Sequence, residues 1–301
     1  MTSVRSVLAA GLVVGLLALA VVPACSRASR SSEGAIKVTG SDTMVNLANA
    51  WSEAFNQSHP DIALQVKGGG SGVGIKSLIS GKTEVATSSR PMKPKEIEEV
   101  KASQGKEPKE YIVGRDALAL YVHPTNPIDS ISIPELAEMY GEGGKISNWK
   151  DLGIDNPGCA SGEIILVSRQ NSSGTYAYFR EAILGETREY KQGATGQSGS
   201  SDVVALVSKT PCAIGYSGMA YKTPEVKFVS VSKLKGEPAI APTLENTLDG
   251  SYPIARPLYL YTLGEPTGAA AEFIQWVMGP EGQKIVEEQG YVPNPKSSAG
   301  E

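Results

Sequence analysis

An arginine and several hydroxyl residues stand close together on one short stretch of the sequence, SRQNSSGTYAYFR at residues 168–180. The stretch follows an apolar run at residues 164–167, which is typical of a buried strand, and leads into a segment typical of a helix start. Three kinds of chemistry fit such a turn. A hydroxyl could act as a nucleophile, the arginine and the hydroxyls could hold an anion, or a serine could simply cap the helix.

Two earlier turns have the same composition, Gly40-Ser41-Asp42-Thr43 and the glycine-rich run at residues 68–72. Each follows a predicted strand and opens a predicted helix, where unpaired N–H groups and a partial positive charge are available. One such turn is usually only a helix cap. Three of them at the carboxyl ends of parallel strands favour a small anion held by N–H and O–H groups, with Arg169 as a bidentate cation.

Motifs for other chemistry are incomplete. Ile75 interrupts the glycine-lysine-serine order that a nucleotide-binding Walker A loop requires. Neither Ser71 nor Ser173 has the flanking glycines of a nucleophile elbow. The two histidines, His59 and His123, stand in segments typical of loops or strand ends, and no Cys/His/Asp cluster has metal-ligand spacing. We therefore predict no enzyme, no metal and no cofactor.

Strands and helices that alternate along the chain position these turns. The chain has 301 residues, 41% hydrophobic and 20% charged, with a net charge of -4, so it is globular and not suited to a nucleic-acid partner. The alternation predicts an α/β fold with mostly parallel sheets. We expect strands at residues 35–38, 62–66, 84–88, 117–122, 164–167 and 213–216. We expect helices at residues 45–55, 75–79, 94–103, 132–140, from about 176, and at 202–208, 269–278 and 280–289.

The N-terminal segment predicts export. Arg5 precedes an apolar run at residues 7–22, and we interpret residues 1–24 as a signal peptide and residues 25–34 as a flexible tether. Ala24 followed by Cys25 resembles a bacterial lipobox, in which Cys25 would be lipidated, although Pro23 departs from that pattern. The alternative is ordinary cleavage after Ala24. Either reading places the protein in the periplasm or on the outer face of the cell membrane.

Export gives a meaning to the two remaining cysteines, because an oxidising compartment favours disulfides. Cys159 and Cys212 both stand just ahead of strand-like runs. If those strands are parallel neighbours, both cysteines fall at the same sheet edge. We predict a Cys159–Cys212 disulfide, which the chain-entropy model values at about 4 kcal/mol for a loop of this length. The alternative is two buried free thiols.

Seven segments together resemble one known family. In chain order they are VTGSDTM, GGGSG, SSRPM, DALALYVHPTNP, SRQNSSGTY, KTPCAIGYSG and ARPLYLYTLG. They resemble the periplasmic phosphate-binding proteins of the phosphate-specific ABC transporter, over about residues 35–295. The resemblance implies a type II solute-binding fold: two α/β lobes, a hinge, and phosphate held in the cleft. It also implies a membrane permease as partner, and we expect a monomer.

No linker separates the halves of the chain after residue 34, so we expect more than one crossing between the lobes. We place the crossings near residues 116 and 256. Residues 35–116 with 256–297 would then form lobe I, and residues 117–255 would form lobe II. For Asp116 we expect a role at the hinge, or a pairing with Arg115 or Arg169, rather than a ligand contact.

The resemblance also implies a ligand site. Thr43 and the N–H group of Met44 match the first-lobe loop, and Ser71 matches the serine of the second turn. The second-lobe arginine and Ser-Gly-Thr loop match Arg169 and residues 173–175. The complete predicted set is Ser41, Asp42, Thr43, Met44, Ser71, Ser89, Arg90, Arg169, Ser173, Gly174 and Thr175.

One position departs from the family. Well-studied members have an aspartate in the third turn, which accepts the phosphate proton and so rejects sulfate, but this chain has Ser89. We propose Asp42 as the substitute acceptor, with helix capping as its alternative role. Arg90 could be a second cation or part of a surface salt bridge. The departure keeps open a binding protein for sulfate, molybdate or tungstate. A phosphate-ester hydrolase using Ser173 or Thr175 is a weaker alternative.

Overall fold

The structure is a computed structural model that describes residues 35–294. The described residues form one compact unit. The predictions for the signal peptide, for Cys25, for the tether and for residues 295–297 lie outside the described residues. Between residues 35 and 294, no helix has the length and apolar character needed to cross a membrane.

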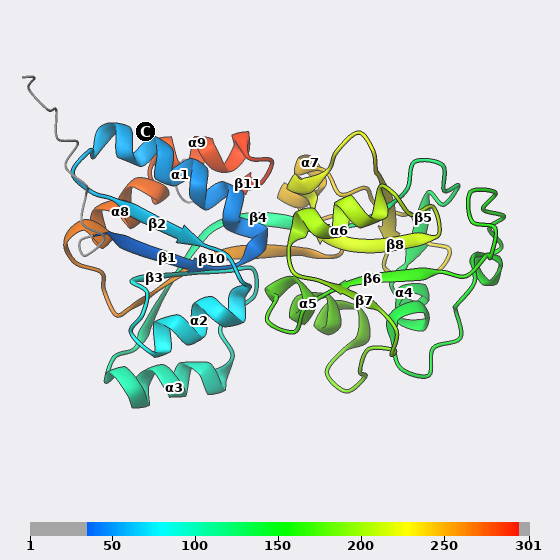
Figure 1. Ribbon diagram of the computed structural model, residues 1–301, viewed down its shortest axis with the longest axis horizontal. Coiled ribbons are helices and arrows are strands. Elements are labelled where there is room, and N and C mark those ends of the chain that lie inside the picture. The colour runs from blue at the N-terminus through cyan, green and yellow to red at the C-terminus, as the bar shows by residue number, and fades with distance from the viewer. Residues whose placement is uncertain (1–34, 295–301) are drawn as a thin grey trace, which may run out of the picture. The chain divides into compact units, whose positions relative to one another are not determined.

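Lobe I is built around three parallel strands, β1 (Ile36–Gly40), β2 (Leu64–Lys67) and β3 (Val85–Ser88), in the order β2-β1-β3. Helices α1 (Val45–Ser58), α8 (Gly268–Met278) and α9 (Pro280–Glu288) lie on one face of this sheet. Helices α2 (Ser71–Ile79) and α3 (Pro94–Gln104) lie on the other face (Figure 1). Because β3 is covered on both faces, all four of its residues are buried, whereas the edge strand β2 alternates.

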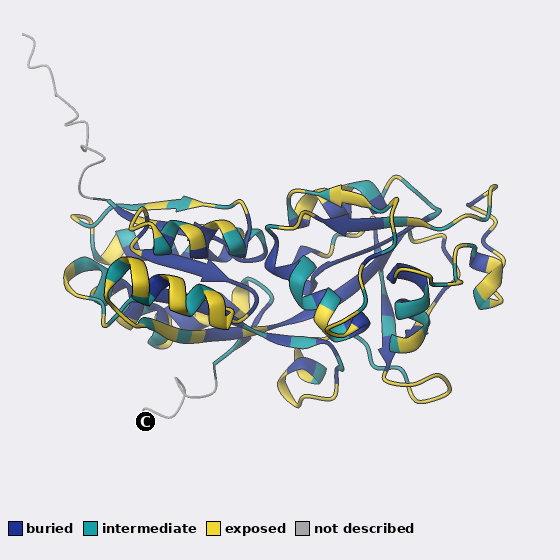
Figure 2. Cartoon of the chain, turned by 90° about the horizontal axis from the view of Figure 1, so that it is seen from below, coloured by how far each residue is buried: buried dark blue, intermediate teal, exposed yellow. Residues whose placement is uncertain are grey.

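Helix α1 shows how the sequence pattern builds this core. Its buried residues, Leu47, Ala48, Trp51 and Phe55, recur every three or four positions and form one face of the helix. That face packs on Phe273 of α8, whose ring meets the Phe55 ring edge to face at 5.4 Å between centroids. Figure 2 shows the result, with buried strands and helices that expose their outer sides.

Lobe II has a second sheet with strands β8 (Ala213–Gly218), β6 (Ile165–Arg169) and β7 (Thr195–Gln197), in which β6 pairs in parallel with both neighbours. Strands β5 (Ser130–Ser132) and β9 (Lys227–Ser232) extend it. Its helices are α4 (Ile133–Tyr140), α5 (Gly174–Phe179), α6 (Ser200–Val207) and α7 (Leu244–Leu248). The short helical turns of both lobes are η2 (Asp42–Met44), η3 (Trp149–Leu152), η4 (Arg180–Leu184) and η5 (Met219–Tyr221).

Two long antiparallel strands, β4 (Pro108–Val122) and β10 (Ala255–Leu263), connect the sheets of the two lobes (Figure 1). Strand β10 joins β3 on its other side, and residues 118–122 of β4 join β8. The short strand β11 (Val292–Pro293) also pairs with β4. The sequence predicted only residues 117–122 of β4, because residues 108–115 find their partner in a distant segment that the local pattern does not reveal. The predicted two-lobed α/β fold is confirmed.

The predicted Cys159–Cys212 disulfide is also confirmed, with 4.8 Å between the two Cα atoms. The reason is the one that the sequence suggested. Strands β6 and β8 are parallel neighbours with Ile165 opposite Ala213, so the residues that precede them meet at one edge of the sheet.

Replacing both cysteines by serine, Cys159→Ser with Cys212→Ser, should lower the free energy of unfolding by about 2–4 kcal/mol, because the unfolded chain regains the freedom of a long loop. Urea unfolding of the chain lacking residues 1–24 measures this. Dithiothreitol should shift the wild-type midpoint towards that of the variant and leave the variant unchanged. Equal midpoints for the oxidised wild type and the variant would contradict the prediction.

Candidate functional site

The two predicted turns of lobe I meet at the carboxyl ends of β1 and β2. The N–H group of Gly70 donates to the carbonyl of Gly40 at 2.9 Å, which joins the two turns directly. Gly40 has a φ of 151°, and a Cβ there would lie 2.1 Å from the carbonyl oxygen of Thr87, so the close approach requires glycine.

Three serine hydroxyls of lobe I gather beside these turns. The hydroxyl of Ser41 donates to the Ser89 hydroxyl at 3.0 Å, and the Ser71 and Ser89 hydroxyls lie 3.4 Å apart. The Ser71 oxygen also accepts the backbone N–H of Ser89 at 3.0 Å. All three side chains are buried. The third turn, where an aspartate was expected, therefore contributes a hydroxyl to the same cluster.

The arginine-containing turn at residues 169–175 lies in lobe II, between β6 and α5. Ser173 is the helix cap, since its side-chain oxygen accepts the N–H groups of Thr175 and Tyr176 at 3.1 and 3.3 Å. The alternative in which a serine of this turn caps the helix is therefore confirmed for Ser173. The cap fixes the direction in which α5 starts. Gly174 and Thr175 follow as buried residues of the first turn of α5.

The turns of the two lobes touch each other. The hydroxyl oxygens of Thr43 and Thr175 lie 2.8 Å apart, and the N–H of Gly72 donates to the carbonyl of Ser172 at 2.9 Å. A Cβ at Gly174 would lie 2.2 Å from the Ser71 side-chain oxygen and 2.7 Å from that of Ser89. Only glycine lets the lobes come this close.

Arg169 lies at the end of β6 with its guanidinium fully buried. One terminal nitrogen donates to the Ser200 hydroxyl, and the other donates to the carbonyl of Ser198 and to Asp42, each at 3.0–3.2 Å. Its Nε–H is buried and has no hydrogen-bond partner among the described residues. Burial lowers the pKa of Arg169, and the charge of Asp42 opposes that change. An unpaired buried donor is costly, so the Nε–H is the site's clearest open position.

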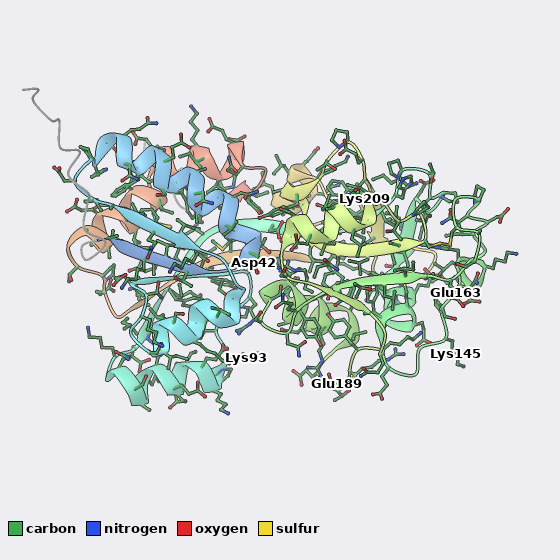
Figure 3. All side chains as sticks on the ribbon, in the orientation of Figure 1. Asp42, Lys93, Lys145, Glu163, Glu189 and Lys209 are labelled. Carbon is green, nitrogen blue, oxygen red and sulfur yellow. A yellow bond between two sulfur atoms is a disulfide. The ribbon has the colours of Figure 1, made fainter. Side chains whose placement is uncertain are left out.

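Asp42 links the two lobes, and Figure 3 labels it where they meet. One carboxylate oxygen accepts the N–H of Gly69 at 2.7 Å, and the other accepts the Arg169 guanidinium at 3.2 Å. No side chain caps the start of η2 or of α1. The capping alternative for Asp42 is therefore wrong. The carboxylate instead holds the neighbouring glycine-rich turn and the arginine of the opposite lobe.

Two predicted residues have their polar groups engaged elsewhere. The Arg90 guanidinium forms a bidentate pair with Glu96 at 2.7 and 2.8 Å and donates to the carbonyl of Pro91. The salt bridge is thus the alternative that the structure shows for Arg90. Met44 buries its side chain in the lobe I core, and its N–H donates to the carbonyl of Ser41 at 3.0 Å.

Arg256, which the sequence did not predict as a site residue, lies among the turns of both lobes. Arg256 is buried on β10 directly opposite Asp116 on β4, and its Nε and one terminal nitrogen donate to the same Asp116 oxygen at 3.0 and 2.8 Å. That terminal nitrogen also donates to the hydroxyls of Thr175 and Thr43 at 3.0 and 3.3 Å. Only its place at a predicted crossing could have signalled this role.

Asp116 pairs with Arg256 rather than with Arg115 or Arg169, and the expected hinge role stays a prediction. Its second oxygen accepts the N–H of Met219 at 3.1 Å, so it ties β4 to the end of β8. Burial raises the pKa of Asp116, and the charge of Arg256 works in the opposite direction. The Asp116 carboxyl group accepts from three donors, two on Arg256 and one on Met219.

Fold and site together define a class of protein. Two α/β lobes are joined by paired strands, and hydroxyls, N–H groups and two arginines converge where the lobes meet. This is the type II solute-binding class, in which a small ligand is held between the lobes.

The comparisons specify the family. A model of the PBP superfamily domain matches residues 26–281. The phosphate-binding protein PstS of Pseudomonas aeruginosa is 32% identical over 303 residues, covering 97% of this chain and 93% of that one. PstS of Bacillus subtilis is 34% identical over 270 residues, covering 89% and 83%. The chain belongs to the PBP superfamily and, within it, to the family of PstS phosphate-binding proteins.

Solved structures agree with this assignment. A phosphate ABC transporter substrate-binding protein from Clostridium perfringens, with bound phosphate, superposes with a TM-score of 0.76 at 29% identity, covering 86% of this chain and 99% of that one. An ABC-type phosphate transport receptor from Vibrio cholerae gives a TM-score of 0.68 at 25% identity, covering 86% and 100%.

Proposed function

We propose that this protein binds one inorganic phosphate between its lobes and delivers it to the permease of an ABC importer. Two observations carry the proposal: the buried Nε–H of Arg169 has no hydrogen-bond partner among the described residues, and the lobes bring the hydroxyls of Thr43 and Thr175 to within 2.8 Å of each other. A tetrahedral oxyanion offers acceptors in several directions at once, so it could satisfy donors that neither lobe alone can pair. The PstS names of the relatives point to phosphate as that oxyanion.

The ligand set that we propose is smaller than the set predicted from sequence. Donors would come from Thr43, Ser71, Ser89 and Thr175, from the N–H of Gly174, and from Arg169. Ser41 supports Ser89. Ser173 acts as the cap of α5, and Arg90 is omitted because its guanidinium is paired with Glu96. Closure would trap the anion, because only the closed form brings the donors of both lobes to it.

Asp42 is the proposed acceptor for the proton of phosphate. It approaches Arg169 at the boundary of the lobes, and each of its oxygens has lone pairs left after the contacts with Gly69 and Arg169. Sulfate carries no proton at neutral pH and would meet only repulsion from this carboxylate. In this proposal Asp42 takes the role of the aspartate that other family members have at the position of Ser89.

We also propose that the protein is exported, that Cys25 is lipidated and that the protein is a monomer. The proposal includes the boundaries of the two lobes. The signal-like segment of residues 1–24 supports export. The crossing of β4 and β10 near residues 116 and 256 supports lobe I as residues 35–116 with 256–297, and lobe II as residues 117–255.

Hydrolysis of a phosphate ester has no support in the site. The Ser173 oxygen accepts two backbone N–H groups, and the hydrogen bonds of the two histidines are formed with other residues. His59 stacks on Phe55 at the end of α1, and His123 bonds to Thr125. We propose that the protein is not an enzyme, and turnover of p-nitrophenyl phosphate would contradict this.

Titration calorimetry of the chain lacking residues 1–24 tests the phosphate assignment. We expect one phosphate per chain and sulfate binding at least about 100-fold weaker, a difference of about 2.7 kcal/mol. Arsenate, which has the same shape and also carries a proton, should bind like phosphate. Sulfate that binds as tightly as phosphate would overturn the assignment.

Asp42→Asn tests the source of discrimination. Removing the carboxylate charge should strengthen sulfate binding about tenfold or more and weaken phosphate binding, which narrows the ratio of the two dissociation constants. Asp61→Asn, an exposed aspartate of lobe I, is the matched control and should leave both constants unchanged. If Asp42→Asn keeps the wild-type ratio, Asp42 is not the acceptor.

Gly174→Ala tests closure. Its methyl group would collide with the side-chain oxygens of Ser71 and Ser89, so the variant should fold normally but bind phosphate at least about 100-fold more weakly. In the control Gly196→Ala, a Cβ meets only the carbonyl of Arg169 at 3.8 Å, an ordinary contact, and affinity should be retained. Calorimetry with both variants, and circular dichroism for the fold, decide the outcome. Wild-type affinity in Gly174→Ala would show that the lobes do not close on the ligand in this way.

A further inference from the structure

Arg256 and Asp116 form an ion pair at the crossing of the lobes with both side chains fully buried. They are opposite neighbours on β10 and β4, the two strands that belong to both lobes. The pair therefore sits on the hinge itself, whereas Arg169 belongs to lobe II. A buried ion pair is weak evidence for stability, because desolvation offsets most of its Coulomb attraction. A role in the site is a better reason for its presence.

The contacts of Arg256 reach every proposed ligand-binding turn but one. One terminal nitrogen donates to the hydroxyls of Thr43 in lobe I and Thr175 in lobe II. The other donates to the carbonyl of Ser89 in the third turn, at 3.3 Å. Arg256 thus touches both sides of the site from the boundary between the lobes.

The arginine determines which way the two threonine hydroxyls point. A guanidinium can only donate hydrogen bonds, so both hydroxyl oxygens act as acceptors towards Arg256. The hydroxyl protons must then point away from it. With the oxygens 2.8 Å apart, one proton can bridge them, and the other has no acceptor in any hydrogen bond that the structure shows for this pair. That proton is the one a ligand oxygen would accept.

We propose that Arg256, held by Asp116, is a positioning residue for the anion: by donating to the oxygens of Thr43 and Thr175, it orients this hydroxyl pair so that one proton bridges the two oxygens and the other points towards the ligand. This inference rests on the proposed phosphate function and deepens it. It assigns a binding role to a residue pair outside the ligand-binding turns. It also explains how a threonine hydroxyl can donate to an anion, which accepts hydrogen bonds.

Testing Arg256 requires a variant that stays folded. Removing the arginine alone leaves Asp116 buried without a partner, which is strongly destabilising. The charge-matched double variant Arg256→Met with Asp116→Asn removes both charges, keeps the length of the side chain, and retains an acceptor for the N–H of Met219. We expect a thermal midpoint close to wild type and a phosphate dissociation constant about 10- to 100-fold higher, the range for lost hydrogen bonds to a charged group.

A cycle with Thr175→Val separates positioning from a merely structural role. In the wild-type background, Thr175→Val should weaken phosphate binding about tenfold, within the range for one hydrogen bond to a charged group. In the Arg256→Met, Asp116→Asn background the hydroxyl is no longer oriented, so the same substitution should cost only about twofold. Calorimetry with inorganic phosphate measures all four proteins.

The outcomes are distinct. A reduced effect of Thr175→Val in the double-variant background supports the positioning role. The full tenfold effect in both backgrounds, or wild-type affinity in the folded double variant, overturns this inference while the phosphate function stands. Absence of phosphate binding by the wild-type chain overturns the proposed function, and the inference falls with it.

Discussion

Two arginines are buried where the lobes meet, and each is tolerated there because one carboxylate lies within bonding distance. Arg169 has Asp42, and Arg256 has Asp116. A guanidinium without such a partner would carry a desolvation cost that a domain of ordinary stability cannot sustain. The positions of the two aspartates therefore constrain the rest of the site. One pair spans the lobes, and the other joins the two strands that connect them.

The two pairs have different relations to opening. The Asp42–Arg169 contact joins a turn of lobe I to a strand end of lobe II, so separating the lobes must break it or lengthen it. The Asp116–Arg256 pair lies across one antiparallel ladder and keeps its geometry as long as β4 and β10 stay paired. An open form would thus lose one carboxylate–guanidinium contact and keep the other. If the lobes open, the cation on β10 would be preformed, while the cation on lobe II would regain its carboxylate partner on closure.

The turns could be predicted from sequence because their signals are local. A strand, glycine, a hydroxyl and a helix start stand within a few residues of one another at Gly40, Gly70 and Ser173, and the fold brings them to adjacent strand ends. The disulfide followed from the same logic, since parallel neighbours place the residues before Ile165 and Ala213 at one edge.

Arg256 could not be predicted in this way. It stands in the apolar strand segment ARPLYLYTLG, where nothing nearby suggests an anion, and its partner Asp116 lies 140 positions away. The same limit applies to β4, whose first half is defined by its pairing with β10 rather than by its own pattern. The contacts of Asp42 were also only partly predictable from the local sequence. Its place before a helix suggested a cap, but the helix start is left uncapped because Gly69 and Arg169 compete for the carboxylate.

Selectivity in such a site cannot come from its net charge. Two arginines and two aspartates cancel, and the chain as a whole is acidic, with a net charge of -4. What remains is the balance of donors and acceptors that face the ligand.

If Arg256 fixes the threonine hydroxyls as donors, those groups bind any tetrahedral oxyanion and distinguish none. Only a hydrogen-bond acceptor in the site can then distinguish a protonated oxyanion from an unprotonated one. Ser89 does not supply a charged acceptor, whereas the aspartate at this position in other family members does. Asp42 already accepts from Gly69 and Arg169, so it would have to accept the ligand's proton with its remaining lone pairs. If Asp42 is that acceptor, the Asp42–Arg169 pair is both a contact between the lobes and the place where phosphate and sulfate would be told apart.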